Sequence, residues 1–199
     1  LTVPRPIGWL STVSREGVHN LAPFSQWQNL TFDPPMVMFA ANQSVLGGRK
    51  DTVRNIEDTG WFVWNMATWD LREAVNTSAM ALPEDVDEFE RAGVTKAPAV
   101  DAVCMRVAES PCHFECRHVT TLRLPGRSDV GTVDIVVGEV VRIHIAEDCI
   151  TADGKVDVLK IKPIGRMGYF DYTVVDNVFE MRIPAATPEE AAGLEGAKR

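Results

Sequence analysis

Short apolar runs separated by turn residues open the chain, a pattern typical of β-strands. Residues 7–13 form the first run, and the Ser-Arg-Glu-Gly sequence at 14–17 supplies turn chemistry. Residues 18–27 can then return as the second arm of an antiparallel hairpin. After the Asp-Pro-Pro break at 33–35, the almost wholly apolar run 36–41 predicts a central strand that is buried on both faces.

A short helix is predicted after a glycine pair. Gly47 and Gly48 open a loop, and Asp51 is placed as the helix N-cap. Val53 lies on the expected buried side, and Gly60 provides the C-terminal stop. The sequence therefore predicts a helix whose N-terminus adjoins a glycine loop.

The remaining elements are predicted from the same signals. They follow in this order: a strand at 61–67, helices at about 68–79 and 83–92, strands at 112–124 and 132–145, an aromatic-rich loop at 165–172 and an apolar stretch at 174–183. We interpret the two helices as an insertion that covers a barrel. Near the end of the chain, Thr187, Pro188 and Glu190 have the arrangement of a capping box and predict a short helix.

Many strands at short spacing with few helices predict a mainly β fold, and a barrel more than a sandwich or a doubly wound sheet. No Gly-x-Gly-x-x-Gly follows a strand, so there is no Rossmann signal. A length of 199 residues with 45% hydrophobic content suits one sizeable core. We expect one domain over residues 1–184 and a short helix or tail over 185–199.

The charge of the chain limits its partners. A formal net charge of −8 argues against a general affinity for nucleic acid or an anionic membrane, because the average surface repels phosphate. An anionic ligand therefore needs a local basic patch. No apolar run approaches the roughly 20 residues of a membrane span, and residues 1–8 have no signal-peptide core. We expect a soluble, cytoplasmic protein with no nucleic-acid and no membrane partner.

The cysteines give no metal or disulfide pattern. Cys104, Cys112, Cys116 and Cys149 lack paired Cys-x-x-Cys spacing, so reduced thiols are the default expectation. The alternative is a metal cluster of Cys112, Cys116 and His118 on one strand face, but nothing nearby is spaced to provide a fourth ligand.

The glycine loop and the helix after it have the composition of a phosphate site. Glycines allow close approach of the backbone, while free N–H groups and the helix dipole favour an anion. Four side chains can add donors: Arg49, Lys50, Thr52 and Arg54. Ordinary surface cations at a solvated helix start are an equally weighted alternative. Asp51 opposes close approach of a phosphate, so we assign its side chain to capping of the helix N–H groups.

Polar residues set into apolar strands form a second constellation. They are Ser11 and Thr12 in the first strand and Ser25, Gln28 and Asn29 at the end of the second. An isoalloxazine ring needs a flat apolar slot with a few donors and acceptors for its pyrimidine edge, and these residue types suit such positions. On their own, such residues are more often ordinary polar residues of a strand face.

Four successive motifs resemble those of flavin reductase-like, FMN-binding split-barrel proteins. They are Arg-Pro-Ile-Gly-Trp-Leu-Ser-Thr-Val at 5–13, Asn-Leu-Ala-Pro-Phe-Ser at 20–25, Asp-Pro-Pro-Met-Val-Met-Phe at 33–39 and Lys-Asp-Thr-Val-Arg-Asn-Ile at 50–56. Later segments at 88–93, 109–111, 115–116 and 137–140 extend the resemblance to about residue 183. The resemblance implies a Greek-key type, FMN-binding split β-barrel with a few short peripheral helices.

The resemblance also implies a homodimer that holds FMN at its interface. The phosphate would lie on the helix start at residues 50–52, and the ring against Ser11, Thr12 and the Ser25 loop. Residues 166–169 would close over the flavin. The residues predicted to bind the cofactor are Ser11, Thr12, Ser25, Gln28, Asn29, Arg49, Lys50, Asp51, Thr52, Arg166 and Tyr169, with no metal ligand. For Tyr169, Phe170 and Tyr172, an aromatic cluster that caps the core is the alternative.

The implied activity is that of an FMN-dependent oxidoreductase that passes electrons through bound flavin, with NADH or NADPH as a candidate donor. Family members that use NADH often carry Gly-Asp-His in a late strand, whereas the corresponding stretch here is Gly138-Glu139-Val140. The missing histidine leaves a flavoredoxin-like electron carrier as the alternative. A monooxygenase or another redox protein is the candidate partner. His19, His113, His118 and His144 give no catalytic assignment.

Overall fold

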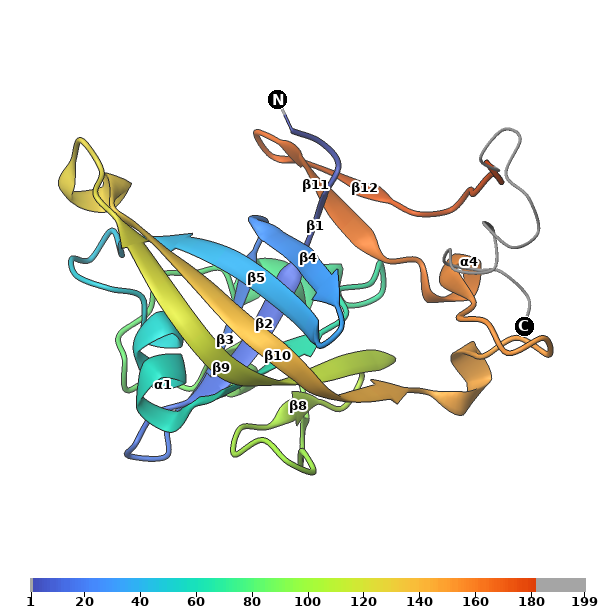
Figure 1. The fold of residues 1–199 in the computed structure, drawn as a ribbon, viewed down its shortest axis with the longest axis horizontal. Helices are drawn as coiled ribbons and strands as arrows, with labels where there is room; N and C mark the ends of the chain where they lie inside the picture. The colour runs from blue at the N-terminus through green and yellow to red at the C-terminus, as the bar shows by residue number, and fades with distance from the viewer. Residues whose placement is uncertain (1, 182–199) are drawn as a thin grey trace.

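The structure is a computed structural model that describes residues 2–181. Its centre is a seven-stranded antiparallel sheet that curls into a barrel, with strand order β3-β2-β6-β9-β10-β5-β4 (Figure 1). The strands are β2 (Gly8–Val13), β3 (His19–Phe24), β4 (Trp27–Phe32), β5 (Pro35–Asn42), β6 (Trp61–Asn65), β9 (Cys112–Leu124) and β10 (Val133–Ile145). The mainly β barrel predicted from the sequence is confirmed.

Two strand predictions were wrong in detail. The expected arm at 18–27 is two strands, because the chain bends at Ser25 and Gln26 between β3 and β4. The expected loop at 165–172 is a hairpin, since β11 (Ile164–Gly168) pairs with β12 (Asp171–Val174). Strand β12 ends at Val174, and the apolar stretch after it is irregular as far as residue 181.

Smaller sheets flank the barrel. Strand β1 (Arg5–Pro6) pairs with β11, which gives a three-stranded sheet of order β1-β11-β12. Strands β7 (Lys96–Ala97) and β8 (Arg106–Val107) form a two-stranded pair. The N-terminal segment and the β11–β12 hairpin therefore lie side by side, although the strands of the barrel come between them in the sequence (Figure 1).

The helices are short. Helix α1 (Asp51–Thr59) ends at Gly60, whose φ of 79° requires the left-handed conformation that glycine adopts freely, as predicted. The other helices are α2 (Arg72–Thr77), α3 (Glu88–Ala92) and α4 (Val158–Ile161), with 3₁₀ turns η1 (Asp129–Gly131) and η2 (Glu147–Cys149). Helices α2 and α3 start later than expected. For α3 the reason is Asp87, whose carboxylate caps the N–H groups of Phe89 and Glu90.

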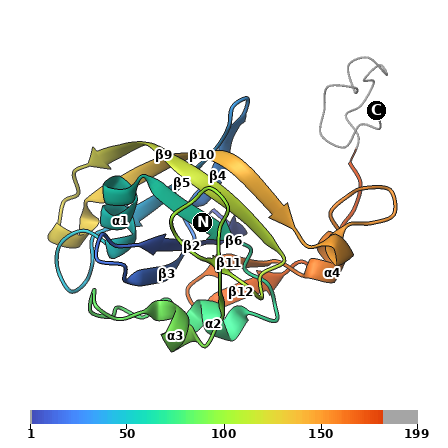
Figure 2. The same ribbon diagram turned by 90° about the horizontal axis from the view of Figure 1, so that it is seen from below.

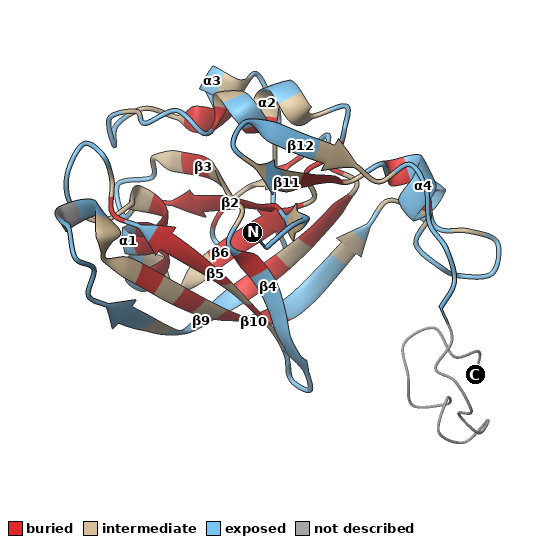
Figure 3. Ribbon diagram, turned by 90° about the horizontal axis from the view of Figure 1, so that it is seen from above, coloured by how far each residue is buried: buried red, intermediate tan, exposed pale blue. Residues whose placement is uncertain are grey.

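Two large apolar clusters and a small one around Val13, Val63 and Cys104 make the core. One large cluster fills the barrel and includes Leu10, Phe39 and Phe62, while the other lies between the sheet and helices α2 and α3 and includes Trp9 and Phe89. Figures 2 and 3 show α2 and α3 against the β2–β3 side of the barrel, so the predicted covering role of this segment is confirmed. Among the helices of residues 2–181, none has both the length and the apolar character that a membrane span requires. The tail predicted at 185–199 lies outside the described residues.

Candidate functional site

The start of helix α1 is built as the sequence suggested, except for its cap. Gly47 and Gly48 have φ values of 100° and 74°, which side-chain-bearing residues rarely adopt. Lys50 is the N-cap residue, in extended conformation, and no side chain caps the helix. The prediction that Asp51 caps the helix was wrong, because Asp51 is its first helical residue and its carboxylate pairs with Arg54.

Backbone donors are left open at this helix start. The N–H groups of Val53 and Arg54 both donate to the carbonyl of Lys50. Within residues 2–181, the N–H groups of Asp51 and Thr52 have no acceptor, and the ammonium of Lys50 forms no ion pair or hydrogen bond. Two free N–H groups beside an unpaired cation are a suitable arrangement for an anion.

Arg49 forms ion pairs with two acids. Its Nη1 and Nη2 lie 2.6 and 2.7 Å from the carboxylate oxygens of Glu57, and its Nε lies 3.2 Å from Oδ2 of the fully buried Asp134. The hydrogen bond to Glu57 raises the pKa of Arg49, against the effect of its burial. Arg49 is therefore oriented beside the helix start, with its charge largely balanced.

The hydroxyl of Thr52 points into the protein. It donates to Oδ1 of Asn20 at 2.8 Å, and the hydroxyl of Thr12 lies 3.2 Å from the same oxygen. Asn55 completes the network, since its amide donates to Thr12 at 3.1 Å. Thr12 and Thr52 are thus brought together through Asn20, and only the backbone N–H of Thr52 faces the helix start.

Ser11 lies one residue away on β2 and is also fully buried. Its hydroxyl donates to the carbonyl of Met105 at 2.6 Å and accepts from the amide of Asn65 at 3.2 Å. Ser11 and Thr12 therefore support the sheet from inside, and their direct contact with a flavin stays a prediction.

A second cluster surrounds the bend after β3. Nε of Arg5 lies 3.3 Å from the hydroxyl of Ser25. Arg5, Ser25, Gln28 and Met38 line an open groove of about 710 Å³. Asn29 follows Gln28 on β4 and so points to the other face of the strand, away from this groove.

The β11–β12 hairpin adjoins this second cluster. Strands β1 and β11 are hydrogen-bonded neighbours, and in their register Arg5 lies opposite Arg166. Nη1 of Arg166 donates to the hydroxyl of Tyr172 at 2.7 Å, its guanidinium lies 4.8 Å above that ring, and Nη2 donates to the carbonyl of Tyr169. Tyr169 and Phe170 are 84% and 96% exposed, so they do not cap the core. The alternative of a core-capping aromatic cluster was wrong for these two residues.

The two clusters lie at opposite ends of β3. Asn20, next to the helix start, pairs with Thr12, while Phe24, next to Ser25, pairs with Gly8. With a strand rise of about 3.3 Å per residue, Asn20 and Ser25 are roughly 16 Å apart. A single ligand that reaches both clusters in one protomer must therefore be extended.

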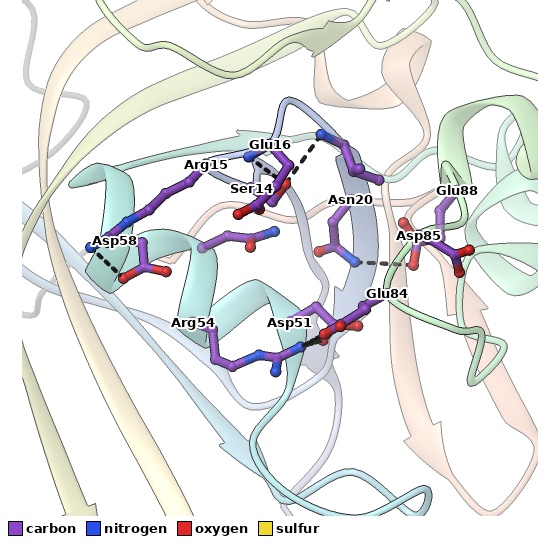
Figure 4. A pocket seen from close by; sticks show the side chains of 12 residues that line it. Ser14, Arg15, Glu16, Asn20, Asp51, Arg54, Asp58, Glu84, Asp85 and Glu88 are labelled. Carbon is purple, nitrogen blue, oxygen red and sulfur yellow. Dashed lines mark hydrogen bonds and ion pairs between the residues drawn. The ribbon is translucent and has the colours of Figure 1, made fainter.

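Polar groups that the sequence reasoning missed lie beneath the site. Asn20 and Glu88 were noted only as members of family-like motifs, yet Glu88 accepts a hydrogen bond from the Asn20 amide at 3.1 Å (Figure 4). Asp134 was not singled out at all, although it is an acid within an apolar strand and contacts Arg49. For Asn20 and Asp134, the available signal was a polar side chain at an inward position of an apolar strand; Glu88, at the start of α3, had no such signal.

Glu115 is a further buried acid. Its carboxylate accepts hydrogen bonds from the N–H groups of Val100, Asp101 and Ala102, and Nε2 of His144 lies 2.6 Å away. Burial would raise the pKa of Glu115, but these donors outweigh it and lower the pKa to about 2. No partner of His144 was predicted from the sequence.

The other candidate metal and thiol groups are enclosed. Cys104, Cys112, Cys116 and Cys149 are free and buried, and burial raises the pKa of each thiol. His113 is buried against the Val107 carbonyl, and burial lowers its pKa to about 4. Within residues 2–181, no group of three or more His, Cys, Asp or Glu side chains is arranged to hold a metal ion.

Comparisons with known proteins show the family and the fold of the chain. The family model described as flavin reductase like domain matches residues 1–160. Nitrilotriacetate monooxygenase component B from Bacillus cereus superposes with a TM-score of 0.83 at 31% identity, over 90% of this chain and 88% of that one. The 2-nitrobenzoate 2-nitroreductase of Pseudomonas fluorescens gives 0.80 at 26% identity, over 94% and 88%. A split barrel domain protein of Shewanella frigidimarina gives 0.79 at 23% identity, over 92% and 88%, which shows the fold alone.

Proposed function

The chain belongs to the flavin reductase-like family and has its split-barrel fold, and from this premise we propose that it is an FMN-dependent oxidoreductase that passes electrons through bound flavin. We propose further that it acts as a cytoplasmic homodimer. The four free, buried thiols are consistent with a reducing compartment.

The observation that carries the proposal is the uncapped start of α1. A phosphate monoester needs several donors and a positive potential, and the N–H groups of Asp51 and Thr52 with the ammonium of Lys50 supply both. The carboxylate of Asp51 is paired with Arg54, which reduces its repulsion of an anion. The residues present therefore fit the phosphate of FMN.

The groove at the other end of β3 fits the ring. Trp27 and Met38 give it apolar surface, while Ser25, Gln28 and Arg5 provide donors and acceptors. We propose that Arg166 and Tyr169 border the ring from the hairpin beside β1. Ser11 and Thr12 are proposed to complete the site through the strand that they stabilise, whereas Asn29, on the other face of β4, is not proposed to contact the ring in this groove.

When bound, FMN supplies the one- and two-electron chemistry, so no side chain need act as a nucleophile. The chain's own residues bind the phosphate, orient the ring and set the charge around it. Arg49 contributes to that charge from a position fixed by Glu57 and Asp134.

An apolar sheet face that residues 2–181 leave accessible supports the homodimer. Residues on β5 and on the first part of β10 alternate between buried and accessible. Most outward positions there and at the paired end of β9 are apolar, among them Met36, Met38, Leu122, Ile135 and Val137. These strands are neighbours, so their outward side chains form one continuous face. A face of this kind is typical of a protein interface, and a second copy of the chain is the proposed occupant.

The electron donor and acceptor distinguish two candidate functions, a nicotinamide-dependent enzyme and an electron carrier. We propose NADH or NADPH as donor for the enzyme, and a monooxygenase or another redox protein as partner, in line with the name of the Bacillus cereus relative. The stretch Gly138-Glu139-Val140 favours the second candidate, a flavoredoxin-like carrier without its own nicotinamide site. Gly138 and Val140 are buried there, and Glu139 is paired with Arg117.

Steady-state oxidation separates the two candidates. The full chain is incubated with FMN and either NADH or NADPH, and absorbance of the reduced nicotinamide is followed. Turnover with either donor supports the enzyme. FMN binding without turnover supports the carrier, and failure to bind FMN in a fluorescence titration contradicts both.

A further inference from the structure

A carboxylate lies buried beneath the start of α1. Glu88, at the first position of α3, is 6% exposed. One of its oxygens accepts from the Asn20 amide at 3.1 Å and the other from the N–H of Leu21 at 3.3 Å. Figure 4 shows Glu88 facing Asn20 across the edge of a cavity of about 430 Å³. Glu88 therefore joins α3 to β3.

Asn20 extends this connection to α1. Its amide nitrogen donates to Glu88, and its carbonyl oxygen accepts from the hydroxyls of Thr52 and Thr12. An amide can do both only in one orientation, so the acid on one side fixes which atom faces the hydroxyls on the other. Thr52 is the second residue of α1, and its N–H is one of the two open donors of the helix start.

We infer that Glu88 is a positioning residue for the phosphate end of the flavin site: it orients Asn20, Asn20 holds Thr52, and Thr52 fixes the direction of the open N–H groups of α1. This inference rests on the proposed function. It assigns to Glu88 a role in FMN binding without any contact with FMN.

Packing alone does not explain an acid at this position. Next to it, Phe89 is fully buried and supplies the apolar contact of α3 with the sheet. Burial raises the pKa of Glu88 to about 7, against the hydrogen bonds from Asn20 and Leu21. A buried carboxylate is costly, and the apolar contact of α3 with the sheet does not require one. What an apolar side chain cannot do is orient Asn20.

The variant Glu88→Gln tests the route because it keeps the size of the side chain. A glutamine that accepts from Asn20 places its own NH₂ against the N–H of Leu21. If the side-chain amides of the glutamine and of Asn20 both flip, the NH₂ of Asn20 faces the Thr52 hydroxyl, which then loses its acceptor. The double variant Asn20→Asp with Glu88→Gln restores all of these bonds, since the aspartate accepts from Thr52 and from the glutamine. Glu90→Gln, on the exposed side of the same helix, is the matched control.

Affinities for FMN and riboflavin are measured by fluorescence titration of the full chain. Riboflavin lacks the phosphate, so general damage lowers both affinities together. Glu88→Gln should weaken FMN binding about three- to tenfold and riboflavin binding less than twofold, the size of one lost hydrogen bond. The double variant should return to within about twofold of the wild-type FMN affinity, and Glu90→Gln should change neither ligand.

Three results overturn the inference while leaving FMN binding intact: an unchanged FMN affinity in Glu88→Gln, an equal loss for both flavins, or no recovery in the double variant. A wild-type protein that does not bind FMN overturns the proposed function and this inference with it. If Glu88→Gln does not fold, Glu88→Met replaces it, because an apolar side chain of similar length suits the buried position and should give the same FMN-selective loss.

Discussion

Nε2 of His144 lies 2.6 Å from Oε1 of Glu115, which has no exposed surface. The carboxylate also accepts hydrogen bonds from three successive N–H groups, those of Val100, Asp101 and Ala102. The Glu115 carboxylate thus connects its own strand, β9, to strand β10 and to the loop between β7 and β8.

This arrangement predicts loss of stability in acid. The folded-state pKa of Glu115 is about 2, below the ordinary value of 4.5, so its contribution is complete above pH 4.5 and is lost as the pH falls toward 2. Glu115→Gln should cost roughly 2–3 kcal/mol at pH 6 and flatten the dependence of stability on pH below 4.5. Urea unfolding at pH 6 and pH 3 measures both. Parallel pH curves for the variant and the wild type would rule out this role of Glu115.

The buried ion pair of Asp134 and Arg49 should matter more than the exposed pair of Arg49 and Glu57. Asp134 is fully buried, whereas the side chain of Glu57 is 31% exposed. We expect Asp134→Ala to cost about 2–4 kcal/mol, because Arg49 loses its inner partner. Glu57→Ala should cost less than about 1 kcal/mol. Chemical denaturation compares the two, and equal losses would contradict the difference in burial.

Gly138 should tolerate no side chain while Phe62 keeps its position. A Cβ at Gly138 would lie 2.4 Å from two ring carbons of Phe62. Gly138→Ala is therefore expected to cost about 1–3 kcal/mol through overpacking. Adding Phe62→Leu should recover part of that loss in thermal unfolding. Stability of Gly138→Ala equal to that of the wild type would show that the ring moves freely.

The outward apolar face of β5, β9 and β10 should form the dimer interface. Light scattering of the FMN-bound wild type should give a dimer mass, and Val137→Lys should shift it to the monomer because a charge would be buried in an apolar contact. Glu16→Lys, in the exposed turn after β2, is the control and should stay dimeric. A dimer that survives Val137→Lys would place the interface elsewhere.

Local patterns predicted the barrel well. Strand β9 has the predicted bounds, and Gly60 ends α1 where a left-handed residue was needed. Local signals failed where the structure of a segment depends on its turn or on a side chain that is distant in the sequence. The sequence predicts a loop in place of the β11–β12 hairpin because the two strands are short and their turn is rich in glycine and aromatic residues.

The candidate site likewise has features that depend on neighbouring residues and features that depend on residues distant in the sequence. The glycine loop and the position of the helix start could be predicted, since both depend on neighbouring residues, whereas the start was expected to be capped by Asp51 and is open. The inward hydroxyl of Thr52 could not, because its acceptor Asn20 is 32 positions away. Glu88 is 68 positions from Asn20, and only the packing of α3 on β3 brings the two together.

Lys50 tests the central claim that this chain binds FMN through its phosphate at the start of α1. A charge-assisted hydrogen bond to an anion contributes about 1.5–3 kcal/mol, so Lys50→Ala should weaken FMN binding roughly ten- to a hundredfold. Fluorescence titration should show almost unchanged riboflavin affinity and a smaller salt dependence for FMN. Equal losses for FMN and riboflavin, or an unchanged FMN affinity, would contradict the account.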